Sequence, residues 1–167
     1  MLDDVVANGT SFEAYARPFA EFQLCARQDD VLRLRYAFDS EVEAHGGTVY
    51  ECEYLHRQWS LQFFRLPYPQ REAYKVWCDG ELVAGMEVFE LLWSADVCYA
   101  DGTVWHCRTD VLGSIITDSE NDRMLHTYPK PGLILGGSSI HIDHPASLAR
   151  VLPLLMILTH FTTHDSG

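Results

Sequence analysis

The sequence has few basic residues, and this shortage excludes several kinds of partner. Lysine and arginine number 12 against 24 aspartates and glutamates, so the formal net charge is −12 at pH 7. Binding to nucleic acid backbones and to anionic membrane surfaces needs dense positive charge. We therefore expect no nucleic-acid partner, and the net charge also disfavours peripheral lipid contact.

Long apolar runs are also absent. The most apolar segment is 151–158, enclosed by Arg150 and His160, whereas a membrane span needs about 20 consecutive apolar residues. The first residues, MLDDVVANGTSFEAY, lack the basic and apolar regions of a secretory signal. We therefore expect a cytoplasmic protein without a transmembrane segment.

The sequence has no CxxC pair and no recognisable catalytic motif. Its five cysteines are an odd number in apolar or aromatic surroundings, which indicates free thiols in a reducing compartment. There is no HExxH, and GLILGGSS lacks the lysine of a phosphate-binding loop. Adjacent residues point to opposite faces of a strand, so His106 and Cys107 are not placed as a catalytic pair. We expect no cofactor and favour a non-enzymatic protein.

What the sequence does contain is alternation of period two, the signal of half-buried strands. In WSLQFFRL, for example, Trp59, Leu61 and Phe63 share one face. Gly46-Gly47, Asp79-Gly80 and Asp101-Gly102 are typical of tight hairpin turns. About eleven strands are predicted, at 22–26, 31–38, 48–55, 59–66, 73–78, 82–92, 95–99, 103–108, 112–117, 123–128 and 133–142.

A helix is predicted at about 146–164, where the apolar residues fall on every side. Asp143 or His144 is the expected cap, and Pro153 requires a kink or a later start. A helix that is apolar all round has to be surrounded by protein. The predicted fold is therefore mainly β, a single domain over residues 1–167. It is a closed antiparallel β-barrel of about eleven to twelve strands, threaded by the hydrophobic C-terminal helix.

Two hairpins and the final helix carry a family resemblance. YKVWCDGELVAGMEV and ADVCYADGTVWHCR, followed by ARVLPLLMILTHF, resemble the tubby C-terminal-like family, which includes the LURP-one-related and phospholipid scramblase-like proteins. The resemblance implies a twelve-stranded closed barrel threaded by a helix. The alternative is a calycin or lipocalin-like barrel that carries an apolar small ligand beside Trp59, Trp77, Trp93 and Trp105.

One segment, HRQWSLQFFRLPYPQREAYK, combines basic and aromatic residues. The ligand-binding candidates in and beside it are Arg57, Arg65, Arg71, Lys75, Trp59 and Trp77. Tubby proteins bind phosphoinositide head groups through a basic surface, so the resemblance implies that such a site would be sought here. The alternative is an exposed basic–aromatic strand pair.

Acidic residues dominate the segment from 81 to 122. The candidates for partner binding are Glu81, Glu87, Glu90, Asp96 and Asp101. Gathered on one face, they would attract a basic protein partner and speed its association; otherwise they are solvated strand faces and turns. The leading hypothesis is a non-enzymatic binding or scaffold protein that binds another protein through this acidic surface.

Histidines give a third hypothesis, a metal-binding protein. The candidate ligands are His141, His144, His160 and His164. Residues four apart share a helical face, and imidazoles with a carboxylate suit zinc or another divalent ion. The alternative is polar residues at a helix end, where a positive imidazolium favours the helix dipole.

Overall fold

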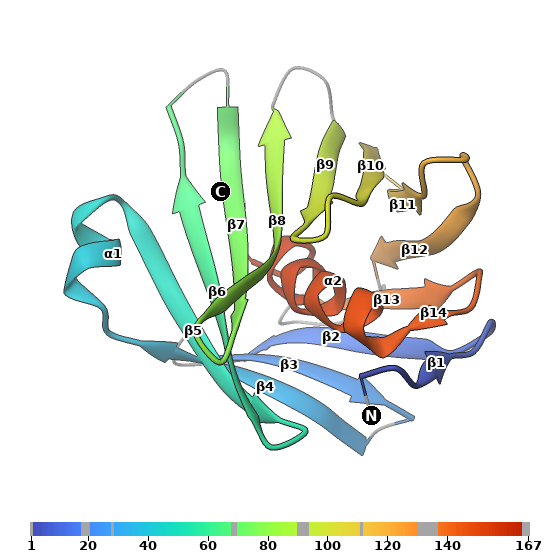
Figure 1. Cartoon of the computed structure of the whole chain (residues 1–167), viewed down its shortest axis with the longest axis horizontal. Helices are drawn as coiled ribbons and strands as arrows, with labels where there is room; N and C mark the ends of the chain where they lie inside the picture. Colours follow the sequence, from blue (N-terminus) through green and yellow to red (C-terminus); the bar gives the residue numbers. More distant parts are fainter. Residues whose placement is uncertain are drawn as a thin grey trace.

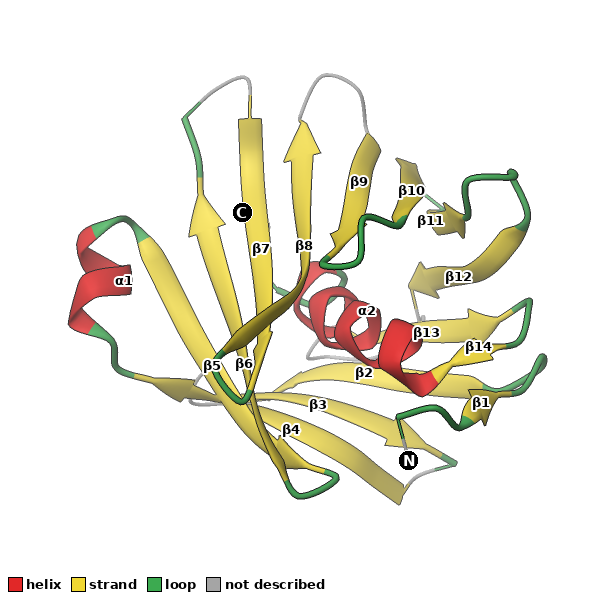
Figure 2. Cartoon of the chain, in the orientation of Figure 1, coloured by secondary structure: helices red, strands yellow, loops and turns green. Residues whose placement is uncertain are grey.

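The computed structural model describes residues 2–17, 21–27, 29–67, 70–89, 94–110, 112–129 and 137–164. Its main feature is a closed barrel of twelve antiparallel strands (Figure 1; Figure 2). The barrel strands are β2 (Ser11–Arg17), β3 (Glu21–Ala26), β4 (Asp29–Ala37), β5 (Gly47–Tyr54), β6 (Arg57–Arg65), β7 (Gln70–Cys78), β8 (Glu81–Phe89), β9 (Ser94–Tyr99), β10 (Val104–Asp110), β11 (Gly113–Thr117), β12 (Arg123–Pro129) and β13 (Gly137–Ile142).

Four further elements complete the fold. β1 (Val5–Val6) pairs with β14 (Ala146–Ser147) outside the barrel, and a short helix α1 (Ser40–Ala44) connects β4 to β5. The long helix α2 (Leu148–Phe161) follows β14 directly. No helix in the described part of the chain is long and apolar enough to span a membrane.

Each barrel strand pairs with its neighbours in the sequence, and one long-range pairing closes the ring. That pairing joins β13 to β2, with Ile140 opposite Phe12. Inward positions alternate with outward ones along each strand: on β6, Trp59, Leu61 and Phe63 are buried while the residues between them are partly exposed. The barrel wall therefore has one apolar face, and this face points inward.

Helix α2 fills the barrel interior (Figure 1). Its residues from Val151 to His160 are all buried and belong to the same core as the inward side chains of the strands. A barrel of eight strands is just wide enough to be filled by side chains, so twelve strands leave room for a helix. The predicted barrel with an internal C-terminal helix is confirmed, and α2 occupies the space where a lipocalin-like carrier would hold its ligand.

The helix start differs in detail from the sequence-based expectation. The cap is Ser147, not Asp143 or His144, because residues 146–147 pair with β1 before the helix begins. Pro153 lies inside α2. Its missing N–H would otherwise bond the carbonyl of Ala149, one turn earlier in the helix.

The turns agree with prediction at one glycine pair and differ at another. Asp79 and Gly80 both have positive φ, 49° and 82°, as a tight primed turn between β7 and β8 requires. Gly46-Gly47 does not join two strands directly, because α1 lies between β4 and β5. Asp39 caps α1 by accepting hydrogen bonds from the N–H groups of Glu41 and Val42.

Candidate functional site

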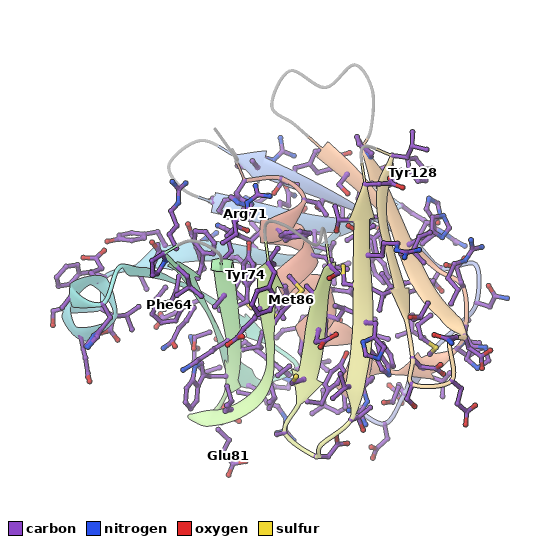
Figure 3. All side chains as sticks on the ribbon, turned by 90° about the horizontal axis from the view of Figure 1, so that it is seen from above. Phe64, Arg71, Tyr74, Glu81, Met86 and Tyr128 are labelled. Carbon is purple, nitrogen blue, oxygen red and sulfur yellow. The ribbon has the colours of Figure 1, made fainter. Side chains whose placement is uncertain are left out.

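The structure brings together two of the predicted acidic residues and separates the others. Glu87 on β8 lies directly opposite Asp96 on β9, and both side chains are exposed. Glu81 is at the other end of β8 (Figure 3), and Asp101 lies in the turn after β9. Glu90 is outside the described residues.

A shallow groove of about 380 Å³ lies beside this acidic pair on the outer face of the barrel. Gly85 lies in register with Lys75 on one side and Cys98 on the other. Because Gly85 has no side chain, the sheet is hollowed between its neighbours. We call this the acidic groove, lined by Lys75, Leu82, Gly85, Glu87, Phe89, Asp96 and Cys98.

The charges of the acidic groove are only partly compensated. Oδ1 of Asp96 lies at hydrogen-bond distance, 2.7 Å, from Nδ1 of His106 on β10. Glu87 has no ion pair in the described part of the chain. The Lys75 ammonium lies over the ring of Phe64 instead, 5.9 Å from its centroid. Two carboxylates thus face each other across the strands, and only the Asp96 carboxylate has a hydrogen-bond partner in the described part of the chain.

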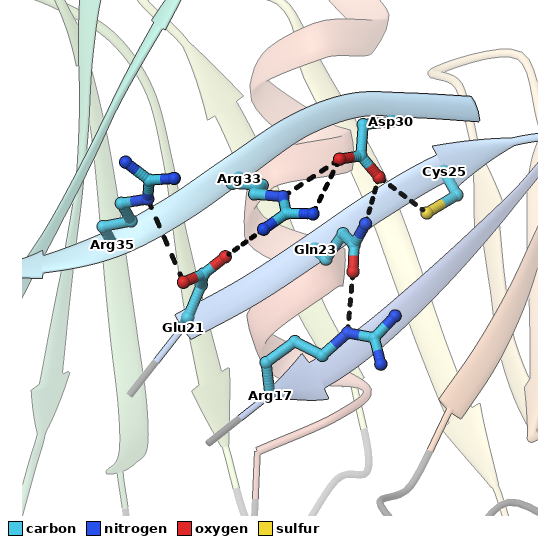
Figure 4. Close-up of polar contacts among 7 residues, drawn as sticks. All are labelled: Arg17, Glu21, Gln23, Cys25, Asp30, Arg33 and Arg35. Atoms are coloured by element: carbon cyan, nitrogen blue, oxygen red, sulfur yellow. Dashed lines mark hydrogen bonds and ion pairs between the residues drawn. The ribbon is translucent and has the colours of Figure 1, made fainter. Parts of the chain in front are cut away.

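The outer face of β2, β3 and β4 shows the opposite arrangement (Figure 4). Arg33 forms ion pairs with Asp30 and Glu21, with N–O distances of 2.8 and 3.2 Å. Gln23 accepts a hydrogen bond of 2.7 Å from Arg17 and donates one to Asp30. The Arg33 guanidinium holds the pKa of the Asp30 carboxyl below its usual range. Charges on this face are therefore paired within the protein.

Asp101 also has an internal partner. Its two carboxylate oxygens accept hydrogen bonds of 3.1 and 2.6 Å from Arg150 at the start of α2. These hydrogen bonds hold the pKa of Asp101 well below its usual range. Asp101 therefore connects the β9–β10 turn to the internal helix. Its negative charge is paired inside the protein and needs no external partner.

The four predicted basic residues do not converge on one site, although two of them lie near each other. Arg57 begins β6 and Arg65 ends it, so they are separated by roughly 26 Å of extended strand. Arg71 lies near Arg65, at the start of β7. Trp59 is buried and donates its N–H to the carbonyl of Tyr54. Among the described residues, Nε1 of the half-buried Trp77 has no hydrogen-bond partner.

His160 lies inside the barrel, against the rings of Phe22, Tyr50 and Phe63. Its Nδ1 is 3.0 Å from the hydroxyl of Tyr74. Burial lowers the pKa of His160 to about 3, since a charged imidazolium is poorly solvated there. At neutral pH this histidine is therefore uncharged and serves as part of the core.

His164 lies one turn further along and makes two polar contacts. Nδ1 is 2.8 Å from the carbonyl of His160, and Nε2 is 3.0 Å from Oε1 of Glu72. A carbonyl only accepts, so Nδ1 carries a proton. The second contact then requires either an imidazolium facing a carboxylate or a protonated Glu72 that donates to Nε2. Oε2 of Glu72 is buried without a hydrogen-bond partner among the described residues.

The other two predicted metal ligands, His141 and His144, lie on β13 and just after it. His141 contacts Oγ of Ser11 at 2.6 Å and the hydroxyl of Tyr128 at 3.0 Å, while desolvation lowers its pKa. His144 is exposed. The described residues include no group of three or more histidine, cysteine, aspartate or glutamate side chains placed to hold a metal ion. A metal site at these histidines stays a prediction.

Sequence reasoning did not single out Glu72, Tyr74 and Ser138, three buried residues whose side chains carry polar groups. One signal was available for Glu72. Because alternate residues of a strand share a face, Glu72 lies on the same face of β7 as the buried residues Tyr74 and Val76. Comparisons of the chain with protein-family models, with curated proteins and with solved structures found no match.

Proposed function

We propose that this chain is a non-enzymatic binding protein that recognises a basic segment of another protein through the acidic groove. The observation that carries the proposal is the facing pair Glu87 and Asp96, beside a hollow in the sheet. Like charges directly opposite each other on adjacent strands are destabilising. A lysine or arginine from a partner would relieve that repulsion and gain two carboxylate acceptors.

The apolar residues of the groove support a peptide rather than a free cation. Leu82 is 44% exposed, and Phe89 also lines the hollow. The stem of a lysine or arginine covers apolar surface while its charged end reaches a carboxylate. The groove therefore suits a segment in which basic and apolar side chains alternate.

The wider setting of the proposal is a tubby-like protein that acts in the cytoplasm. The closed twelve-stranded barrel is the architecture that the tubby C-terminal-like resemblance implied, and it supports membership of that family. Free cysteines support a reducing compartment. The net charge of −12 favours fast association with a basic partner.

A synthetic peptide of alternating lysine and leucine tests the groove directly. Cys98 is exposed, while the other four cysteines are buried, so alkylation of Cys98 reports on access to the groove. We expect saturating peptide to slow this alkylation. The double substitution Glu87→Gln and Asp96→Asn should weaken peptide binding about threefold to tenfold, as exposed charge pairs do.

Glu41→Gln is the matched control, because it removes an exposed acid from α1, which contributes no residue to the groove. Its affinity for the peptide should equal that of the wild type in calorimetry. Equal affinity of the Glu87 and Asp96 double variant, or an unchanged alkylation rate of Cys98 at saturation, would show that the peptide binds elsewhere.

A further inference from the structure

A second hollow lies at the end of the barrel where α2 ends, and it shares no lining residue with the acidic groove. It has a volume of about 210 Å³ and is lined by Arg71, Thr109, Ser114, Thr127, Ser138 and Phe161. We call it the mouth pocket. Figure 3 shows Arg71 and Tyr128, another lining residue, toward this end of the barrel, with Glu81 at the opposite end.

Three hydroxyl-bearing residues of the mouth pocket, Ser114, Thr127 and Ser138, are buried, and one of their hydroxyls has no partner among the described residues. Ser114 Oγ lies 3.0 Å from Thr109 Oγ1, and the Ser114 N–H donates to Thr127 Oγ1 at 3.1 Å. Ser138 is 2% exposed, and its Oγ has no hydrogen-bond partner among the described residues. A buried hydroxyl without a partner costs free energy, so a ligand oxygen at this point would satisfy it.

Arg71 reaches the mouth pocket because β7 is irregular at this residue. Gln70 pairs with Phe89 and Glu72 with Val88, so Arg71 is an additional residue in the ladder. Such bulges redirect a side chain. Nε of Arg71 lies 3.6 Å from Oε1 of Glu72. The terminal N–H groups of its guanidinium have no acceptor among the described residues.

These groups define the chemistry of a ligand. A guanidinium presents two parallel N–H donors that match a carboxylate, and the hydroxyls of Ser138 and Thr127 can donate to the same oxygens. Asp110 also lines the pocket, and its carboxylate would repel a second negative charge on the ligand. Phe161 and Tyr128 supply apolar surface for the rest of the molecule. We propose that the mouth pocket binds a small organic carboxylate with a single negative charge.

The size of the mouth pocket restricts the ligand further. Pockets for drug-sized molecules are about 300–1,000 Å³, whereas this one is about 210 Å³. A compact molecule of roughly the size of one ring fits the space. The two proposals depend on different lining residues, so either can fail without the other.

Benzoate is the probe, and benzyl alcohol is its neutral counterpart. We expect benzoate added to the full chain, labelled with nitrogen-15, to give saturable shifts in the amide signals of Ser114, Thr127 and Ser138. Arg71→Gln should weaken this binding about tenfold or more, since a charge-assisted hydrogen bond is lost. Ser138→Ala should weaken it by a smaller factor.

Arg57→Gln is the control, because Arg57 lies at the other end of β6 from the mouth pocket. It should bind benzoate as the wild type does. Arg71 is 34% exposed, so its substitution leaves the core intact, and circular dichroism verifies that each variant is folded. Shifts that map elsewhere, no saturation, or equal affinity for benzyl alcohol would overturn the proposal.

Discussion

At the scale of single residues, His160 and His164 lie one helical turn apart but contact different kinds of polar group. His160 is surrounded by aromatic rings and contacts a neutral hydroxyl. His164 faces the carboxyl group of Glu72. The rings of the two histidines stack with their centroids 4.6 Å apart, and the positive charge of one raises the cost of charging the other. His160 is therefore neutral in the fold.

The low pKa of His160 predicts a loss of stability in mild acid. Its value is about 3 in the fold against 6.5 ordinarily, so the unfolded chain binds a proton in this range that the folded chain does not. The free energy of unfolding should fall as pH falls from about 6.5 towards 3, by about 1.4 kcal/mol per pH unit. Above this range His160 contributes no pH dependence. Urea unfolding at a series of pH values measures the slope.

The matched variant for this measurement combines His160→Phe with Tyr74→Phe, which removes the titrating ring and leaves no unpaired hydroxyl behind. Acidic side chains contribute to the slope of both proteins, so the difference between the two curves isolates His160. Identical slopes for the variant and the wild type would show that His160 does not titrate as its burial implies.

At the scale of elements, α2 determines whether the barrel has a core. Leu155 is 1% exposed, and Leu155→Asp places an unpaired carboxylate among apolar side chains. We expect this change to cost more than about 4 kcal/mol and to abolish folding. Leu155→Ala should cost about 2–5 kcal/mol through the cavity that it leaves. Thermal unfolding followed by circular dichroism measures both.

Ala149→Asp is the control for the new charge. Ala149 is exposed in the first turn of α2, where a carboxylate favours the helix dipole. This variant should unfold at or slightly above the wild-type temperature. A soluble Leu155→Asp protein with the wild-type melting transition would contradict the role of α2 as the core of the barrel.

Most of these elements were predictable from the sequence because the alternation of apolar residues is local. β2 was missed although Phe12 and Ala14 alternate within it and are buried. α1 was missed because it has five residues and none of them is buried. The polar contacts were harder to predict, since Glu72 and His164 lie 92 residues apart in the sequence. Only the closed barrel brings them together.

At the scale of the whole molecule, the closure of the ring makes every strand depend on the others. β13 and β2 pair although Ser11 and His141 are 130 residues apart. α2 contacts β2 and β3, which come early in the sequence, and also β7 and β8, which come from its middle. A local opening of the barrel wall would expose the common core, so no barrel strand in the described part of the chain can unfold alone at low cost.

We therefore predict that the barrel unfolds as one cooperative unit. Trp59 and Trp105 are buried in the wall, so tryptophan fluorescence reports on the core while far-ultraviolet circular dichroism reports on the strands. The two signals should change at the same urea concentration. Two separate midpoints, or a fluorescence change that precedes the loss of strands, would show that α2 leaves the barrel before the wall unfolds.

The position of α2 in the chain has a consequence for biosynthesis. A ribosome makes the twelve wall strands before the helix that they enclose, and at about 5–20 residues per second this takes several seconds. During that interval the apolar faces of β2 to β13 have nothing to pack against. The wall strands therefore expose their apolar faces until α2 emerges, because the helix that completes the core is translated after the strands that enclose it.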